Sequence, residues 1–241
     1  MKQIIGKKIG MVSLFDINGK IIPATIIYCE PNVVLENKGK EAKHGANLLK
    51  VGAFEANEKK MNKAEAGIFK KLNLAPNKEI RTIKTDQNLN VGDKITVDSF
   101  VSGEFVDVQG TTKGRGFTGA IFRWNKKIGP MSHGHGYPHR WQGSMASGRG
   151  GAAPQRVKKG FRMAGHYGNE IQTMQNLNVV FTDVSKNIIA ISGSIPGPKR
   201  GLVIIKEAIK PHKPLEAYKL ITTSVQKEVA KLETDEKGGN E

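Results

Sequence analysis

The chain has 241 residues, a mean hydropathy of −0.40 and a formal net charge of +16. Its longest apolar stretch, residues 21–29, is far shorter than the roughly 20 residues of a membrane-spanning helix, so we expect no membrane partner. The single cysteine, Cys29, excludes an internal disulfide and a thiolate metal site. Gly6 and the early lysines interrupt any signal sequence, which predicts a cytoplasmic protein.

Residues 1–107 are nearly neutral, with 17 Lys+Arg and 13 Asp+Glu, and their pattern is typical of β-strands. Asn18-Gly19 between two β-rich runs predicts a hairpin over residues 9–29. A helical insertion is predicted at 59–73, where apolar residues recur at helical spacing. Further strands are predicted at 33–36, 80–85 and 95–97.

The positive charge is concentrated in residues 108–169. This segment has 11 Lys+Arg and no Asp or Glu, so it supplies +11 of the +16. It also holds six of the eight arginines and 14 of the 28 glycines. Arginine grips phosphate through two hydrogen bonds and stacks on bases, and glycine lets a backbone approach a ligand closely. The segment therefore predicts an extension that contacts nucleic acid.

The alternative interpretation of this segment is a disordered basic linker. Residues 125–160 have few aliphatic side chains and no helical or strand period, so they cannot build a core of their own. However, Tyr137, Trp141 and two methionines lie within them, and linkers usually lack such residues. We expect the segment to be ordered mainly by its partner.

The β pattern returns in residues 170–212, with strands predicted at 177–184, 188–192 and 202–208. Together with residues 1–107 they give about seven short strands, which predicts a mainly β protein with minor α content and a closed or nearly closed barrel. The basic extension would then separate the two parts of one barrel. Residues 213–241 predict a C-terminal amphipathic helix and a frayed tail.

Two sequence patterns in the extension suggest other chemistry. Residues 114–119 match G-x-G-x-x-G, but the acidic residue that a dinucleotide fold needs about 20 positions later is missing. His133, His135 and His139 have the spacing of metal ligands, yet no carboxylate or thiolate accompanies them. The same lack of a carboxylate argues against acid–base catalysis. We therefore expect no metal, no cofactor, no small-molecule substrate and no enzyme. The alternatives are a nucleic-acid-modifying enzyme or metalloprotein that uses the histidine cluster, and a general basic RNA chaperone.

Five separated motifs resemble those of the large ribosomal subunit protein three family of bacteria. They are IGKKIGM at 5–11, GTTKGRGF at 110–117, GPMSHG at 129–134, MAGHYGNE at 163–170 and PGPKRG at 196–201. The resemblance covers roughly residues 4–210. Residues 145–153 are longer and richer in Gly and Ala than the common bacterial pattern. Gln155 follows Pro154 instead of preceding it, so the motif of a methylated glutamine near the loop tip is not matched.

The resemblance implies a translation-protein-type barrel with a basic loop that extends into ribosomal RNA toward the peptidyl transferase centre, its tip near residues 141–154. It further implies primary binding to 23S-type rRNA near its 3′ end, a role in nucleating subunit assembly, and ribosomal proteins fourteen and nineteen as neighbours. The residues that we expect to contact rRNA are cations for phosphates and His or Trp for exposed bases. They are Lys113, Arg115, Arg123, Lys126, Lys127, His133, His139, Arg140, Trp141, Arg149, Arg156, Lys158, Lys159, Arg162, Lys199 and Arg200.

Overall fold

The computed structural model describes residues 1–40, 46–145, 157, 159–210 and 218. The chain divides into two compact units: unit 1 is Met1–Thr111 with Ile171–Glu241, and unit 2 is Thr112–Glu170. None of the helices in the described ranges has the length and apolar character required to cross a membrane. The two units are taken in turn below.

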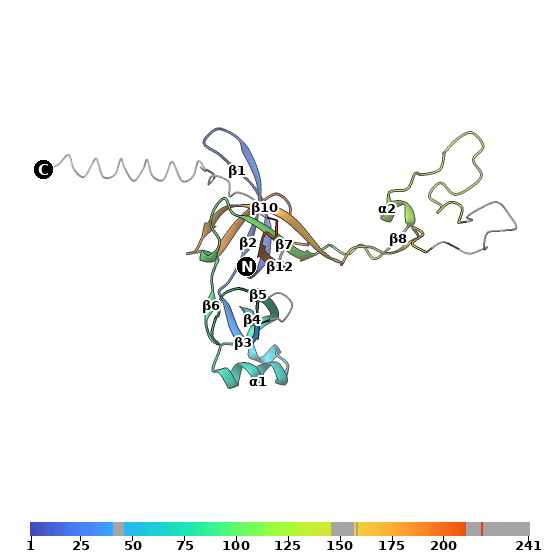
Figure 1. Cartoon of the computed structure of the whole chain (residues 1–241). Helices are drawn as coiled ribbons and strands as arrows, with labels where there is room; N and C mark the ends of the chain where they lie inside the picture. Colours follow the sequence, from blue (N-terminus) through green and yellow to red (C-terminus); the bar gives the residue numbers. More distant parts are fainter. Residues whose placement is uncertain (41–45, 146–156, 158, 211–217, 219–241) are drawn as a thin grey trace. The chain divides into compact units, whose positions relative to one another are not determined.

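Six antiparallel strands of unit 1 close into a barrel (Figure 1). In barrel order they are β1 (Gln3–Phe15), β12 (Leu202–Glu207), β7 (Phe105–Thr111), β10 (Ile171–Asp183), β11 (Ile188–Ser192) and β2 (Ile21–Tyr28). Alternate residues such as Val106 and Val108 on β7 or Val203 and Ile205 on β12 are buried, as the two-residue period of a strand requires. The predicted mainly β barrel is confirmed.

The predicted hairpin is confirmed as β1 and β2. Gly19 has a φ of +75°, and the Asp16 N–H donates to the Lys20 carbonyl at 2.9 Å, which closes the turn. β1 is longer than its pairing with β12, which covers only Gln3–Lys7. The remainder of β1 pairs with β2 alone among the described strands.

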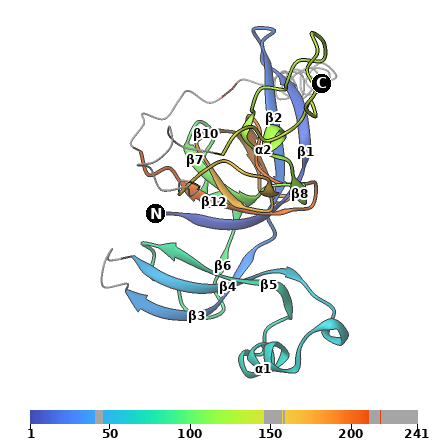
Figure 2. The ribbon, with the colours of Figure 1, turned by 90° about the vertical axis from the view of Figure 1, so that its right-hand side faces the viewer.

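A second sheet in unit 1 differs from the expectation that all the strands join one barrel. It has the order β5 (Asn77–Thr85), β4 (Asn47–Glu55), β3 (Asn32–Lys40) and β6 (Lys94–Ile95). Figure 2 shows this sheet beside the barrel, with α1 (Lys63–Leu72) at one end. The helical insertion is confirmed by α1 and the short 3-10 helix Glu58–Lys60; a further 3-10 turn spans Val97–Ser99.

One continuous core explains why the barrel and the second sheet form a single unit. Buried side chains of β1, including Ile4 and Ile5, pack in the same cluster as Leu49 of β4 and Ile83 of β5. β4 was missed at the sequence level because its Leu, Val and Ala residues are interrupted by Lys50 and Gly52. β4 is buried because it lies between β5 and β3 in the sheet. This position follows from the strand order and cannot be inferred from the residues of β4 alone.

The described part of unit 2 contains little regular structure. Two short strands in it, β8 (Phe117–Thr118) and β9 (Gly165–His166), pair with each other, and α2 (Ala120–Trp124) follows β8. The predicted extension began at residue 108, but β7 continues to Thr111 because Val108 and Gly110 are buried in the barrel. Apart from Tyr218, the predicted C-terminal helix lies outside the described residues.

Candidate nucleic-acid interface

The base of unit 2 is closed by backbone hydrogen bonds between its two ends. The Thr112 N–H donates to the Glu170 carbonyl at 2.9 Å, and the Arg115 N–H donates to the Tyr167 carbonyl at 2.8 Å. Gly168 is buried there with a φ of +74°, and a Cβ at this position would lie 2.1 Å from the Lys113 carbonyl oxygen. This close packing and the two hydrogen bonds hold the two ends of the unit together.

Trp124, at the end of α2, is surrounded by arginines. Its indole Nε1–H donates to the Met163 carbonyl at 2.8 Å, and Arg123 Nη1 donates to the same oxygen at 3.3 Å. The guanidinium carbons of Arg123 and Arg162 lie 5.0 and 5.7 Å from the centre of the Trp124 ring. These distances are those of cation–π contacts, which orient both guanidinium groups without neutralising their charge.

A second aromatic cluster is formed around Phe122, which also belongs to α2. Phe122 and Tyr167 meet edge to face with ring centres 5.9 Å apart, and the Arg115 guanidinium carbon is 5.6 Å from the Phe122 ring. Nearby in the chain, Phe117 is 82% exposed. An exposed aromatic ring beside a guanidinium offers a base both a stacking surface and a cation for its phosphate.

The region around the histidines is held by short-range contacts. The Gly129 N–H donates to the His139 carbonyl at 2.8 Å, and His139 Nδ1 is 2.7 Å from the Pro130 carbonyl oxygen. Tyr137 and Trp141 stack with ring centres 4.9 Å apart and planes inclined by only 10°, and both side chains are exposed. This exposed pair provides a flat face on which an unpaired base can stack.

The three histidines that have the spacing of metal ligands do not converge on one site. His135 and His139 stack with ring centres 6.3 Å apart, whereas His133 is exposed with a φ of +61°. Within the described residues there is no group of three or more His, Cys, Asp or Glu that could hold a metal ion. Because His139 Nδ1 already bonds to a backbone carbonyl, this ring is oriented by the chain itself.

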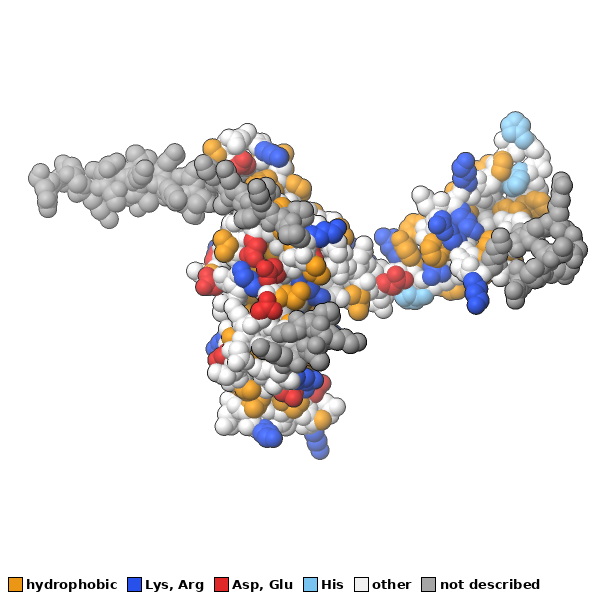
Figure 3. All heavy atoms as spheres, in the orientation of Figure 1, with side chains coloured by type: hydrophobic (Ala, Val, Ile, Leu, Met, Phe, Trp, Pro, Cys, Tyr) orange, Lys and Arg blue, Asp and Glu red, His pale blue; other side chains and the backbone are white. Residues whose placement is uncertain are grey.

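The cations of unit 2 have no carboxylate within residues 108–169 to neutralise them. Lys126 is half-buried, because its Nζ donates to the Gln142 carbonyl at 3.2 Å and lies 4.7 Å from the Phe161 ring. In the space-filling view, Lys and Arg side chains gather with hydrophobic ones on this unit (Figure 3). The exposed members of the predicted set in unit 2 are Lys113, Arg115, Lys127, His133, Arg140, Trp141, Lys159 and Arg162.

Lys199 and Arg200 belong to unit 1, in the loop before β12. The loop is fixed to β1: Lys8 Nζ donates to the Ile195 carbonyl at 2.5 Å, and the Arg200 N–H donates to the Lys8 carbonyl at 2.7 Å. Both predicted side chains are exposed. Of the other predicted contacts, Arg149, Arg156 and Lys158 lie outside the described residues, as does Gln155.

The structure adds residues that sequence reasoning did not select. Phe117, Phe122, Trp124 and Tyr167 add aromatic rings to the surface, whereas the predicted base contacts were His133, His139 and Trp141. The available signal was their alternation with Arg115, Arg123 and Arg162 along the chain. That signal is ambiguous at the sequence level, because an aromatic residue beside a positive charge is equally consistent with a buried core position.

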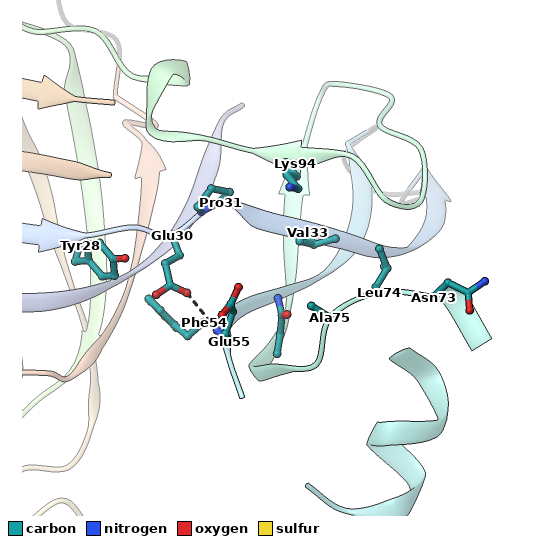
Figure 4. Close-up of a pocket in the computed structure, with 11 residues that line it drawn as sticks. Tyr28, Glu30, Pro31, Val33, Phe54, Glu55, Asn73, Leu74, Ala75 and Lys94 are labelled. Carbon is teal, nitrogen blue, oxygen red and sulfur yellow. Dashed lines mark hydrogen bonds between the residues drawn. The ribbon is translucent and has the colours of Figure 1, made fainter. Parts of the chain in front are cut away.

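A pocket of about 470 Å³ lies in unit 1, between the end of β2 and the segment that follows α1 (Figure 4). Its walls include Tyr28, Glu30, Phe54 and Glu55, and Glu30 accepts a hydrogen bond from the Glu55 N–H at 3.2 Å. Lys7 Nζ lies 3.6 Å from the centre of the Phe54 ring, and partial burial lowers the pKa of Lys7 although Glu30 acts in the opposite direction. Two carboxylates and one lysine, Lys94, lie in the wall, so the pocket has no excess of positive charge that would attract phosphate.

Comparison with known proteins is consistent with these features. Residues 64–181 match the sequence family described as "Ribosomal protein L3". The chain is 44% identical over 245 residues to large ribosomal subunit protein uL3 of Mycoplasma genitalium, a match that covers 98% of this chain and 95% of the relative. It is 47% identical to the uL3 proteins of Mycoplasma pneumoniae and Ureaplasma urealyticum, covering 87% of this chain in both cases and 73% and 89% of those relatives.

Proposed function

The chain belongs to the ribosomal protein L3 family, and from this premise we propose that unit 2 is the part that binds large-subunit ribosomal RNA. The protein is a structural constituent of the large ribosomal subunit in the cytoplasmic ribosome and not an enzyme. Its role in translation is therefore to hold and shape RNA. Unit 1 supplies the folded domain from which unit 2 emerges.

The observation that carries the proposal is the combination of exposed aromatic rings with the cations of residues 108–169, a stretch whose sequence contains no Asp or Glu. Lys and Arg supply the phosphate contacts that dominate the affinity for nucleic acid. Trp141, stacked on Tyr137, and the cluster at Phe122 supply stacking surfaces, which single-stranded RNA uses and a folded protein partner does not require. Because the backbone around His139 and Gly168 is fixed by hydrogen bonds and close packing, these groups are presented in a defined arrangement.

The proposed rRNA site, role in assembly and protein neighbours rest on the resemblance to the family. We propose that the protein is a primary binder of 23S-type rRNA near its 3′ end, that it nucleates assembly of the subunit, and that unit 2 reaches toward the peptidyl transferase centre. Its proposed protein neighbours are ribosomal proteins fourteen and nineteen. The 16 cations, histidines and tryptophan predicted from the sequence are the proposed RNA contacts.

The salt dependence of binding to large-subunit rRNA tests the proposal. With six to ten phosphates neutralised, the logarithm of the affinity falls with the logarithm of salt concentration at a slope of about 0.7 to 0.9 per phosphate. Footprinting of the same complexes tests specificity, because a member of this family protects one defined site whereas a general RNA chaperone protects none. Binding that is nearly independent of salt contradicts the proposal.

Charge-removal variants assign the binding to unit 2. Lys113→Gln, Lys127→Gln and Arg140→Gln remove exposed cations, and in combination they are expected to reduce the salt slope by about 2 to 3. The matched control removes three exposed lysines of unit 1, Lys59, Lys60 and Lys70, and should leave the slope unchanged. Equal losses in the two triple variants would show that the protein binds RNA only through its overall charge.

A further inference from the structure

The outer part of β1 is an unpaired strand edge. Beyond Lys7, which is the last residue of β1 that pairs with β12, the strand continues through Phe15 and pairs only with β2 among the described residues. The last backbone contacts on its other side are those of Lys8, with Gly201 and Arg200. The hairpin therefore extends past the closed part of the barrel, and no strand among residues 1–40, 46–145 and 159–210 pairs with the other edge of β1 there.

The turn defines which backbone groups point to that edge. The Asp16 N–H donates to the Lys20 carbonyl, so this pair is hydrogen bonded, and in an antiparallel ladder the bonded pairs recur at every second residue. Leu14 and Val12 then bond to β2, whereas the N–H and C=O of Met11, Ser13 and Phe15 point away from it. The Gly193 N–H donates to the carbonyl of Pro23, the partner of Ser13, which agrees with this alternation.

The side chains at this edge are apolar and uncharged. Residues 9–15 contain no Lys, Arg, Asp or Glu. Met11 and Phe15 are about half exposed, at 51% and 50%, and Ile21 opposite Phe15 is 58% exposed. Proteins normally protect a strand edge with lysine, proline or a bulge, because an open apolar edge pairs with other chains. β1 has its bulge near Lys8 and Gly10, before the open part, and lacks the other protections there.

We propose that the edge of β1 from Met11 to Phe15 binds an extended, largely apolar segment of another protein of the large subunit, which adds to the hairpin as a third strand. The main-chain N–H and C=O groups would supply the pairing, and Met11 and Phe15 would contact alternate side chains of the segment. The absence of any cation in residues 9–15 argues against RNA as the occupant, because phosphate contacts need positive charge. The choice of a large-subunit protein as the partner rests on the proposed function, whereas the strand edge itself is observed independently of that function.

Hydrogen exchange tests the proposal on the full-length wild-type chain in three states: free, bound to rRNA alone, and assembled in the large subunit. The amides of Met11, Ser13 and Phe15 should exchange quickly in the first two states and slow by about tenfold or more in the subunit. Protection in the complex with rRNA alone would overturn the proposal in favour of RNA. Protection in the free protein that grows with its concentration would overturn it in favour of a second copy, and equal exchange in all states would overturn it altogether.

Two substitutions at one position give an independent readout. Ser13→Pro removes an N–H that points outward and leaves the bonded pairs with β2 in place, whereas Ser13→Ala keeps that N–H and is the matched control. In reconstituted subunits, S13P should lower the occupancy of one neighbouring protein about fivefold or more while rRNA binding is retained; S13A should lower neither. Met11→Lys is a second variant, which places a charge on the edge without introducing a proline that could disturb the hairpin. It should lower the occupancy of the same neighbouring protein as S13P does. Unchanged protein stoichiometry with both S13P and M11K would contradict the proposal, and loss of rRNA binding by the wild type would instead contradict the proposed function.

Discussion

At the scale of single residues, the fold depends on a few positions where no side chain fits. Gly168 combines a left-handed backbone with a Cβ position only 2.1 Å from the Lys113 carbonyl oxygen. Gly116, in the same unit, has a φ of +64° but open space around it. These two glycines therefore separate the cost of the backbone conformation from the cost of a steric clash.

Gly168→Ala is expected to destabilise the base of unit 2 far more than Gly116→Ala. The Gly116 variant should cost about 1 kcal/mol for the left-handed conformation alone, and the Gly168 variant should cost several times as much because Lys113 must also move. The measurement is hydrogen exchange at the amides of Arg115 and Tyr167, which bond across this base. Similar losses of protection in the two variants would show that the clash is relieved without cost.

Cys29 gives the protein a defined response to alkaline pH. The side chain is completely buried, and burial raises the pKa of its thiol well above the usual range. In the unfolded chain the thiol ionises near pH 8.5, so its contribution to stability is fully present below that pH and is lost as the pH rises. The expected loss is about 1.4 kcal/mol of unfolding free energy per pH unit.

Urea unfolding at pH 7.5 and at pH 10, under reducing conditions, measures this effect. Comparison with Cys29→Ala removes the contributions of lysines and tyrosines, which both proteins share. The wild type should lose more stability than C29A between the two pH values. The same change in both proteins would mean that Cys29 becomes accessible to hydroxide without unfolding.

At the scale of elements, local signals and tertiary packing had different predictive value. The hairpin of β1 and β2 was predictable because Asn18-Gly19 specifies its turn, and α1 because its apolar residues have helical spacing. β4 and the separation of a second sheet were not predictable. They depend on pairings between residues far apart in sequence, which no local pattern encodes.

Leu49→Ala tests whether the barrel and the second sheet are one cooperative unit. Leu49 is completely buried in the core that the two share, so its truncation should cost about 2 to 5 kcal/mol. Amides of β12 in the barrel and of β5 in the sheet should lose protection by the same factor. Ile209→Ala, at a position that is 72% exposed, is the control and should change stability by less than about 0.5 kcal/mol. Loss of protection in β5 alone would show that the second sheet unfolds independently of the barrel.

At the scale of the whole molecule, charge and core are divided between the two units. Residues 108–169 supply +11 of the net charge, whereas the main hydrophobic cluster is built entirely from residues of unit 1. In unit 2, Ala120 and Ile121 are the buried apolar residues of the described part. Stability and RNA affinity should therefore respond to different sets of substitutions.

Deletion of residues 133–155 tests that division. It removes no residue of the main core, so the thermal midpoint of unit 1 should stay within a few degrees of the wild type. It removes Arg140 and Arg149, so the salt slope of rRNA binding should fall by about 1.4 to 1.8. Arg140→Gln with Arg149→Gln should reproduce the change in slope while keeping Tyr137 and Trp141. A deletion variant that behaves as an unfolded chain would show that unit 1 depends on this segment.

The sequence by itself determined the class of fold, the hairpin, the helical insertion and the place of the basic segment that we propose binds RNA, because turn residues, periodicity and the distribution of charge are local properties. The tertiary structure alone decided which strands close the barrel, that β3 to β6 form a second sheet, and that Trp124 and Phe122 join the arginines of unit 2. It also decided that, beyond Lys8, β1 pairs with β2 alone among the strands of the described residues. These features arise from contacts between distant parts of the chain, and the free energy of such contacts depends on the packing of both partners.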